Sequence, residues 1–310
     1  MGFIAGPHPG ILHHYSPRLV AFEHSPPASH ASAPESQPKN TIIFIAGLGD
    51  GLLTVPYATK LSQALPPNYR LAEILLFSSY TGWGISSLQR DAAQISECVA
   101  YFKRARPGGK IILMGHSTGC QDTIEYLVGR NAASYTPIDG AILQASISDR
   151  EAIEAELKPA TLKRGIEIAQ KWVAEGKGDD VLPAEATDGS FGSPCTARRW
   201  LSLTSPDHDG DDDYFSSDLS DEQLRQTFGK IPASSPLCIL YSGSDQFVPD
   251  FVDKAALVKK WIGFVKEGGG KVDEEHSGLV KDASHNLIGN DEPVVKDLIE
   301  RVLGFVTKIA

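Results

Sequence analysis

The chain has 310 residues, a formal net charge of −10 at pH 7, 41% hydrophobic residues and 22% charged residues. These proportions are ordinary for a globular protein, and a chain of this length can form one large domain with an insertion. The negative charge argues against nucleic acid or an anionic membrane as the main partner. No apolar stretch reaches the ~18 residues that a membrane-spanning helix needs, so the sequence predicts no membrane partner.

The amino-terminal residues contain no basic segment followed by a long apolar run, so the sequence predicts no secretory signal peptide. Four cysteines, at positions 98, 120, 195 and 238, form no Cys-x-x-Cys pair. Two of them lie in segments predicted as core helix or strand. We therefore interpret them as reduced, partly buried thiols and not as a disulfide framework, and we predict a cytoplasmic protein.

The first forty residues predict a hairpin and a loop. Residues 10–24 read as two strands joined by a turn at Ser16 and Pro17. Residues 25–39 are rich in proline, serine and alanine, which predicts a loop of low complexity.

Continuous apolar runs then alternate with helical patterns. The runs at 41–46, 110–114, 141–145 and 237–241 are typical of strands covered on both faces, and residues 71–86 predict a further strand and a loop. Helical spacing follows Ser87, a good N-cap, recurs over 251–265, and ends the chain after Pro293. This alternation predicts a mostly parallel sheet with helices on both faces.

The sharpest motif lies at residues 111–128. Four apolar residues predict a short buried strand, Gly-His-Ser-Thr-Gly follows at 115–119, and a helical pattern comes next. This context is typical of the nucleophile elbow of an α/β-hydrolase, in which the serine stands at the tip of a sharp turn and flanking glycines let strand and helix approach closely. Ser117 is therefore the predicted nucleophile. The alternative is an ordinary glycine turn between a strand and a helix.

A second glycine-rich loop, Gly-Leu-Gly-Asp-Gly at 47–51, directly follows the strand at 41–46. It lacks the lysine and spacing of a phosphate-binding loop. In the α/β-hydrolase fold this position supplies one oxyanion donor, so we predict that the backbone N–H groups of Leu48 and Thr118 form the oxyanion hole. Asp50 is interpreted as a turn residue, with a place in a pocket as the alternative.

The remaining catalytic residues follow from chain order. Asp245 comes just after the strand at 237–241, and the order Ser, Asp, His requires a histidine downstream. His285 precedes the final helix and is the predicted general base, whereas His276 stands in a more polar stretch and is the weaker candidate. Asp149 is the rival for the acid.

Residues 151–230 interrupt the alternation and predict an inserted lid, which leaves 1–150 and 231–310 as the core. A helical stretch at 151–175 is followed by a section rich in glycine, aspartate and serine. The acidic run at 207–213 has its glycine in the wrong place for an EF-hand and is interpreted as a solvated loop. No cluster of His, Cys, Asp and Glu has convincing catalytic metal spacing, so we predict neither metal nor cofactor.

Substrate contacts are predicted at two places. Loops at the carboxyl ends of strands form active-site walls in this architecture, which favours Tyr80 and Trp83, although they can instead pack their loop onto the core. In the lid, Arg198, Arg199 and Trp200 offer donors and a flat apolar face, with an ordinary helix surface as the alternative.

The ordered motifs resemble the α/β-hydrolase superfamily. More narrowly, GLGDG at 47–51 and GHSTGCQD at 115–122 are similar to a fungal family of intracellular siderophore esterases. The resemblance implies a serine esterase that acts on fusarinine-type hydroxamate siderophores, with a small-molecule ester such as a ferric siderophore as its partner. A general carboxylesterase or lipase-like hydrolase, a peptidase, or a non-catalytic receptor on the same fold are the alternatives.

Overall fold

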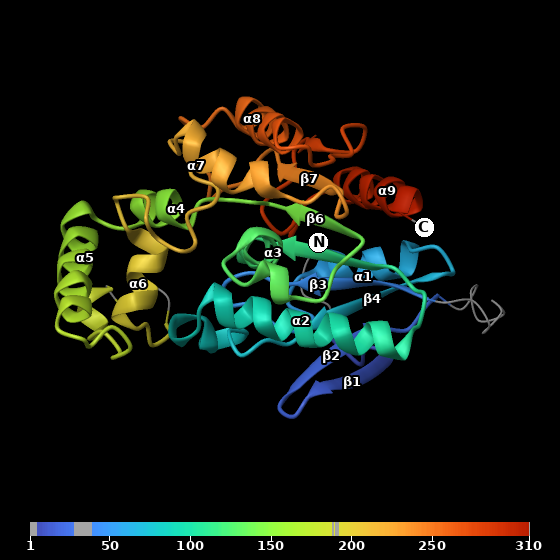
Figure 1. Cartoon of the computed structure of the whole chain (residues 1–310), viewed down its shortest axis with the longest axis horizontal. Helices are drawn as coiled ribbons and strands as arrows, with labels where there is room; N and C mark the ends of the chain where they lie inside the picture. Colours follow the sequence, from blue (N-terminus) through green and yellow to red (C-terminus); the bar gives the residue numbers. More distant parts are fainter. Residues whose placement is uncertain (1–4, 28–38, 188, 190–191, 310) are drawn as a thin grey trace.

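The computed structural model describes residues 5–27, 39–187, 189 and 192–309, so most of the predicted loop at 25–39 lies outside the described residues. Within this part of the chain, eight strands form one sheet in the order β1-β2-β4-β3-β5-β6-β7-β8 (Figure 1). The pairs β1–β2 and β2–β4 are antiparallel, and every later pair is parallel. The strands are β1 (Gly10–Ser16), β2 (Leu19–His24), β3 (Asn40–Ile45), β4 (Tyr69–Ile74), β5 (Ile111–His116), β6 (Gly140–Gln144), β7 (Leu237–Ser242) and β8 (Gly278–Val280).

Helices cover both faces of this sheet, as predicted. On one face lie α2 (Leu88–Ala105), α3 (Thr118–Val128) and α8 (Lys254–Glu267), and on the other lie α1 (Pro56–Ala64) and α9 (Glu292–Ile309). Neighbouring residues of one strand pack on opposite faces of the sheet. Ile43 lies in the core under α2, α3 and α8, and Ile42 lies in the core under α1 and α9. Because side chains alternate along a strand, a strand buried on both faces needs an unbroken apolar run.

The predicted helix starts are mostly confirmed. The Ser87 hydroxyl caps α2 by accepting a hydrogen bond from the Arg90 N–H. The helical stretch predicted over 151–175 is wrong in one respect, because it forms two helices, α4 (Asp149–Glu156) and α5 (Pro159–Ala174). Pro159 stands in the first turn of α5, and a proline disfavours helical conformation in the residue before it, which here is extended.

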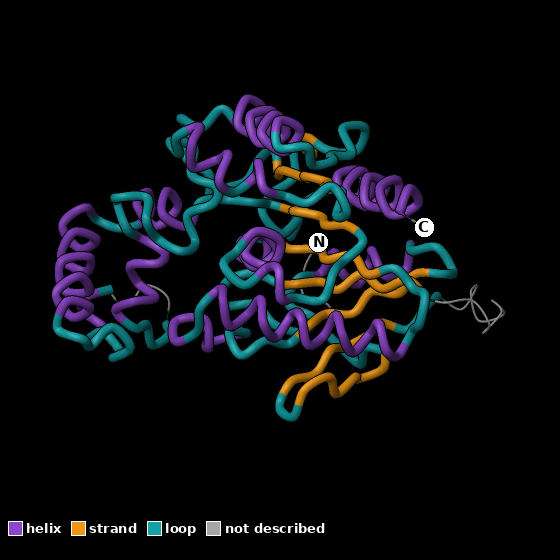
Figure 2. Tube along the Cα trace, in the orientation of Figure 1, coloured by secondary structure: helices purple, strands orange, loops and turns teal. Residues whose placement is uncertain are grey.

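The segment between β6 and β7 contains α4, α5, α6 (Ala197–Thr204) and α7 (Asp221–Gln226), joined by long loops (Figure 2). A small apolar core that includes Trp83, Leu182 and Trp200 holds its first part together. The later residues Phe215 and Phe228 pack against Trp261 of α8, within the main core. The division into a core of 1–150 and 231–310 and an insertion of 151–230 remains a proposal, in which the last part of the insertion packs with the core.

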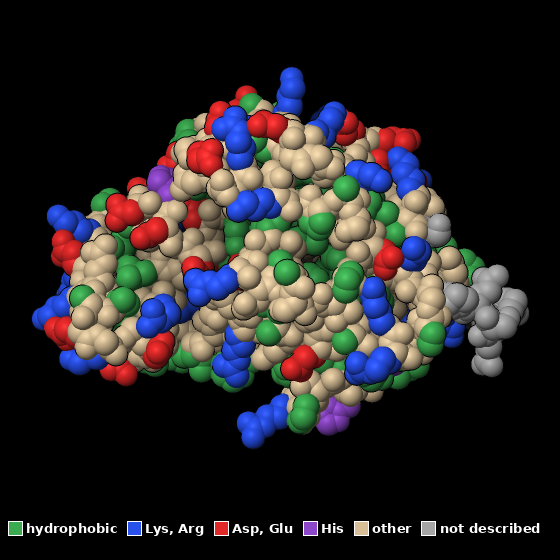
Figure 3. All heavy atoms as spheres, in the orientation of Figure 1, with side chains coloured by type: hydrophobic (Ala, Val, Ile, Leu, Met, Phe, Trp, Pro, Cys, Tyr) green, Lys and Arg blue, Asp and Glu red, His purple; other side chains and the backbone are tan. Residues whose placement is uncertain are grey.

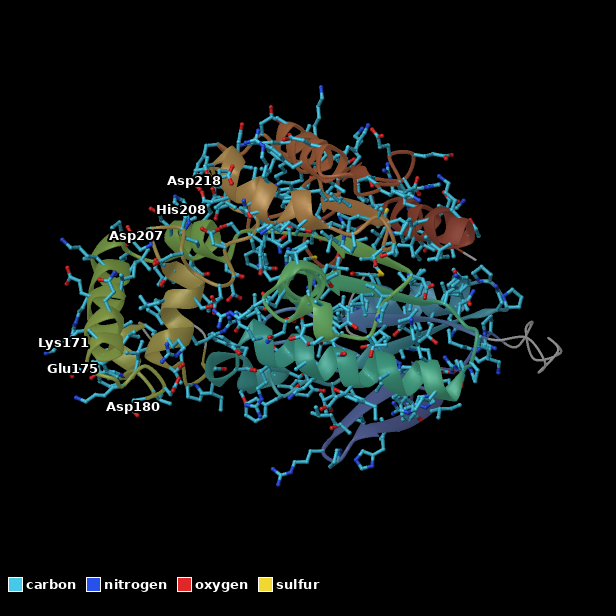
Figure 4. All side chains as sticks on the ribbon, viewed as in Figure 1. Lys171, Glu175, Asp180, Asp207, His208 and Asp218 are labelled. Carbon is cyan, nitrogen blue, oxygen red and sulfur yellow. The ribbon has the colours of Figure 1, made fainter. Side chains whose placement is uncertain are left out.

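The interpretation of residues 207–213 as a solvated loop is wrong for two carboxylates. Asp212 is buried in an ion pair with Arg199, and Asp213 accepts from Arg150 Nε at 3.2 Å. In Figure 4, Asp207, His208 and Asp218 lie together near α4, away from Lys171, Glu175 and Asp180. The acidic run is therefore held in place by Arg199, 13 residues before Asp212, and by Arg150, 63 residues before Asp213.

The surface charge, the cysteines and the length and apolarity of the helices bear on the predicted class of protein. Basic and acidic side chains are interspersed over the face drawn in Figure 3, which shows no extended basic stripe of the kind that binds nucleic acid. All four cysteines are buried and free. None of the helices in the described part of the chain combines the length and apolarity that crossing a membrane requires.

Candidate active site

The turn between β5 and α3 holds Ser117 in an unusual backbone conformation. Its φ is 54° and its ψ is −126°, a combination that costs energy in a residue with a side chain and that recurs at functional sites. A Cβ on Gly115 would lie 2.2 Å from the Gly119 carbonyl oxygen, and one on Gly119 would lie 2.2 Å from the Ile45 carbonyl oxygen. Only glycines allow this close approach of strand, turn and helix.

Gly119→Ala should therefore destabilise the fold. The added methyl group meets backbone atoms of β3 that cannot move aside like a flexible side chain, so we expect a loss of about 1–3 kcal/mol in the free energy of unfolding, measured with urea. Gly263→Ala in α8 is the matched control, because its added Cβ meets nothing within 4 Å apart from its chain neighbours and the backbone of its own helix. That variant should be as stable as the parent or more stable by roughly 0.5–1 kcal/mol. Equal stability of the two variants would contradict this account of the turn.

The structure brings Ser117, His285 and Asp245 together from three separate parts of the chain. His285 Nε2 lies 2.8 Å from Ser117 Oγ, and His285 Nδ1 lies 2.7 Å from Asp245 Oδ2. All three residues are buried. Since an ionised carboxylate can only accept, the bond to Asp245 assigns the proton to Nδ1 and leaves Nε2 to accept the serine proton.

The loop after β7 fixes the histidine from two sides. Gln246 Oε1 accepts from the His285 backbone N–H at 3.1 Å, and the Phe247 ring stands edge-on to the imidazole at 4.9 Å between centroids. Asp245 Oδ1 accepts from the Phe247 N–H at 3.0 Å, so the second carboxylate oxygen is also held. The imidazole and carboxylate are thereby oriented before any substrate binds.

Both predicted oxyanion donors border Ser117. A Cβ on Gly47 would lie 2.8 Å from Ser117 Cβ and 3.3 Å from its Oγ, so the glycine loop that carries Leu48 passes directly against the serine. Thr118 is the first residue of α3, and its N–H therefore has no acceptor within the helix. The amino-terminal end of α3 also favours negative charge at this point.

A buried polar network that the sequence does not reveal supports the histidine. Gln144 Nε2 donates to the His285 carbonyl at 3.3 Å, while Gln144 Oε1 lies 2.8 Å from the Tyr57 hydroxyl and 2.5 Å from His116 Nδ1. Burial, followed by the neighbouring His285, lowers the pKa of His116 to about 4. His116 is therefore neutral at pH 7. No local signal in the sequence links these residues, because each comes from a different element.

A cavity of about 400 Å³ opens above Ser117 and His285. Its walls come from both the core and α4 of the insertion. They include apolar and acidic side chains: Leu48, Ile147, Ile153 and Phe247 on the one hand, and Asp50, Asp149 and Glu156 on the other. Asp50 lines this cavity, so the structure favours the alternative that it is a pocket residue.

The comparisons with known proteins bear on this arrangement. A family model described as "Protein of unknown function (DUF1749)" matches residues 4–307. The chain belongs to this family. The DUF1749 chain is 37% identical to "Fusarinine C esterase sidJ" of Aspergillus fumigatus over 97% of its own length and 96% of that protein. The predicted resemblance to siderophore esterases is thereby confirmed.

Solved structures give the same result for the fold. "Siderophore hydrolase EstB from Aspergillus fumigatus" superposes on the DUF1749 chain with a TM-score of 0.84, at 37% identity and with 98% of each chain covered. An "Alpha/Beta hydrolase fold protein of unknown function" gives a TM-score of 0.61 at 18% identity, with 98% of this chain and 97% of that chain covered. The predicted α/β-hydrolase fold is confirmed.

None of the five residues predicted as substrate contacts lines the cavity above Ser117. The Tyr80 ring lies against Gly51 and its hydroxyl accepts from the Leu52 N–H at 3.1 Å, so it packs the glycine loop. Arg199 donates to the Trp83 carbonyl at 3.0 Å and pairs with Asp212. Trp83 and Trp200 are buried in the small core of the insertion, and Arg198 pairs with Asp179 at its surface.

The rival catalytic residues also have other partners. Asp149 Oδ2 accepts from Gln121 Nε2 at 2.7 Å, while His276 Nδ1 lies 2.6 Å from Asp273 Oδ2. Asp273, Glu275 and His276 place possible ligand atoms within 4.8 Å of one another, but Lys308 Nζ already bonds both carboxylates. The structure thus brings Asp245, and neither Asp149 nor His276, into contact with the Ser117–His285 pair.

Asp149 should make the stability of this protein depend on pH. Burial, followed by the nearby Asp212 carboxylate, raises the pKa of Asp149 from 3.8 to about 7. Between these values the folded state binds more protons than the unfolded state, so the free energy of unfolding falls as the pH rises. Asp149→Asn removes this titration. Its melting temperature should therefore fall less than that of the parent between about pH 5 and pH 8, as measured by calorimetry. Parallel curves for the two proteins would contradict this assignment.

Proposed function

We propose that this chain is a serine esterase that hydrolyses ester bonds of fusarinine-type hydroxamate siderophores as a step in intracellular iron release. The observation that carries the proposal is the hydrogen-bonded series Asp245–His285–Ser117 at the base of a cavity and beneath a glycine loop. The substrate class rests on the 37% identity to a protein named as a fusarinine C esterase. Iron would enter as part of the substrate.

The geometry supports a two-step mechanism. His285 Nε2 takes the proton of Ser117 Oγ as the oxygen attacks the ester carbonyl, while Asp245 stabilises the resulting imidazolium. The N–H groups of Leu48 and Thr118 bind the oxyanion. His285 then gives the proton to the leaving alkoxide. Water, activated by the same histidine, releases the acyl group and restores the serine.

A purified preparation incubated with fusarinine C tests the substrate. Ferric and iron-free forms should both be presented, and mass spectrometry should show linear fragments followed by monomers, each cleaved ester having gained one water. Cleavage of short p-nitrophenyl esters with both fusarinine forms left intact would overturn the substrate and leave the serine esterase. Failure to cleave any ester would instead favour a non-catalytic binding protein.

A general carboxylesterase is the second candidate, because the cavity presents Leu48, Ile147, Ile153 and Phe247 to a ligand. Apolar walls of this kind accept many acyl and alcohol groups. A panel of esters and peptides of graded size, assayed beside fusarinine C, separates the two. A kcat/KM for fusarinine C that exceeds every simple ester supports the siderophore proposal.

A cytoplasmic location belongs to the same proposal. Its support is the set of four free, buried cysteines, which suits a reducing compartment. Fractionation of cells that express the tagged full chain should place it with cytosolic markers. Recovery in the medium or the membrane fraction would contradict this location.

A further inference from the structure

Leu48 lies in a tight turn at the start of the loop between β3 and α1. The Asp50 N–H donates to the Gly47 carbonyl at 3.0 Å, which closes a four-residue turn, and Gly49 within it has a φ of 80°. A φ near this value at the third position is typical of a type II turn. The hydrogen bond across the turn fixes its shape. The place of the Leu48 N–H group above the serine depends in addition on the contacts of the residues that follow.

Tyr80, in the segment after β4, contacts those residues at three points. Its backbone N–H donates to the Asp50 carbonyl at 2.7 Å, and its hydroxyl accepts from the Leu52 N–H at 3.1 Å. A Cβ on Gly51 would lie 2.2 Å from the tyrosine ring, so the ring fills the place of a side chain there. Tyr80 itself has a φ of 58°, a conformation that persists only where surrounding contacts fix it. The tyrosine therefore holds the loop on both sides of Gly51.

Glu73, near the end of β4, holds the next residue of the loop. Its Oε2 accepts from the Leu53 N–H at 2.7 Å, and its Oε1 lies 2.6 Å from His24 Nε2. Glu73 is only 2% exposed, and burial of a carboxylate is costly unless its oxygens are hydrogen-bonded, as both are here. Leu53 has a φ of 65°, which is unfavourable for a residue with a side chain. The buried pair of Glu73 and His24 thus anchors a strained loop residue to the sheet.

We propose that Glu73 and Tyr80 are positioning residues for the oxyanion hole. Through Leu53 and Leu52 they fix the loop, and with it the N–H group of Leu48. This inference rests on the proposed serine esterase function. Neither residue lines the cavity, so both act through the backbone and not by contact with the substrate.

The reason for such support is geometric. An oxyanion donor must lie about 2.7–3.1 Å from the developing charge, and a displacement of about 1 Å can cost on the order of 10²-fold in rate. Functional groups keep this accuracy when the residues behind them are locked by packing and hydrogen bonds. Loss of a loop contact should therefore weaken binding of the transition state more than binding of the substrate.

Substitutions that remove one acceptor test the proposal. Tyr80→Phe deletes only the hydroxyl and should lower kcat/KM on p-nitrophenyl acetate about tenfold, while Glu73→Leu should lower it about 10²-fold. Glu73→Gln should recover most of the second loss, because its amide oxygen can accept from Leu53 while its NH₂ group donates to His24. Tyr80 is 45% exposed, so its variant keeps the test decisive should Glu73→Leu fold poorly.

Tyr101→Phe and Glu23→Leu are the matched controls. The Tyr101 hydroxyl lies 3.0 Å from His13 Nδ1, and the buried Glu23 carboxylate pairs with His13 and Arg106, so neither bonds the loop at 47–54. Both folded controls should keep kcat/KM within about twofold of the parent. Losses as large as those of the loop variants would show a general effect of destabilisation and would overturn the proposal.

A transition-state analogue supplies the readout that a merely structural role would not move. When an alkyl trifluoromethyl ketone binds, Ser117 Oγ adds to the carbonyl carbon, the carbonyl oxygen takes the negative charge, and His285 keeps the serine proton. Tyr80→Phe should weaken this inhibitor about tenfold and leave the inhibition constant of the matching methyl ketone unchanged. The midpoint of the pH profile of kcat/KM should also stay that of the parent, because the contacts of His285 are intact. Parent-like inhibition constants for the trifluoromethyl ketone in both Tyr80→Phe and Glu73→Leu would overturn the proposal.

The parent protein separates this inference from the proposed function. A parent that cleaves p-nitrophenyl acetate, with loop variants that match it in kcat/KM, would reject the positioning role and retain the esterase. A parent that cleaves no ester and does not bind the trifluoromethyl ketone would reject the esterase and, with it, the oxyanion hole. Intact fusarinine C beside cleaved p-nitrophenyl acetate would overturn the substrate alone, and the losses expected in the loop variants would then still support their positioning role.

Discussion

Ser117→Ala should lower kcat on a simple ester by a factor on the order of 10⁶ and leave the protein folded. The hydroxyl lost in this variant is the atom 2.8 Å from His285 Nε2, and the mechanism has no second nucleophile at that point. The residual rate should approach what the oxyanion hole and substrate binding provide by themselves. Steady-state kinetics on p-nitrophenyl acetate, with an active-site titration of the parent, measures the loss.

Folding of the variant is checked by circular dichroism and urea unfolding. The Ser117 hydroxyl accepts no capping hydrogen bond from α3, so removing it should leave the helix intact. A pure, folded Ser117→Ala protein with near-normal turnover would show that another residue is the nucleophile.

Asp245→Asn should lower kcat by a factor on the order of 10⁴. The amide presents a donor where His285 Nδ1–H now finds an acceptor, so the imidazole is driven to the tautomer that carries its proton on Nε2 and cannot accept from Ser117. His285→Ala should be impaired about as severely as the serine variant.

Asp149→Asn is the comparison for the acid. Asp149 follows β6, and its carboxylate is hydrogen-bonded to Gln121 and not to the His285 imidazole. The loss of kcat on a neutral ester should therefore be far smaller in Asp149→Asn than in Asp245→Asn. Full activity of Asp245→Asn together with a dead Asp149→Asn would reverse the choice of acid.

The arrangement of Ser117, Asp245 and His285 could be predicted because each residue has a local signature. Ser117 lies between glycines after an apolar strand, Asp245 follows another such strand, and chain order then leaves few histidines. These signals reflect backbone constraints, such as the 2.2 Å approach of a Cβ on Gly119 to β3. Constraints of this kind act over a few residues and are visible in a single sequence.

The substrate contacts could not be predicted in the same way, because tertiary packing decides them. Arg199 and Trp200 resemble an exposed recognition surface in sequence, yet Asp212 and the small core of the insertion bury both side chains. The wall of the cavity comes instead from α4, whose end at Glu156 depends on the break before Pro159. The hydrogen bond that Gln144 donates to the His285 carbonyl depends on β6 lying between β5 and β7 in the sheet.

Two elements of the fold also lacked a clear pattern. The strand β8 has only three residues, which is too short to show an apolar run or an alternating pattern in the sequence. The helix α1 begins at Pro56 within a loop region and buries one face on the α9 side of the sheet. Both were found only from the structure.

Covalent labelling with a fluorophosphonate, followed by peptide mass spectrometry, tests the central claim most directly. The account predicts one adduct, on Ser117, that is absent from the Ser117→Ala protein and that forms in step with the loss of fusarinine C hydrolysis. An adduct on a different residue, or hydrolysis that persists in fully labelled protein, would contradict it.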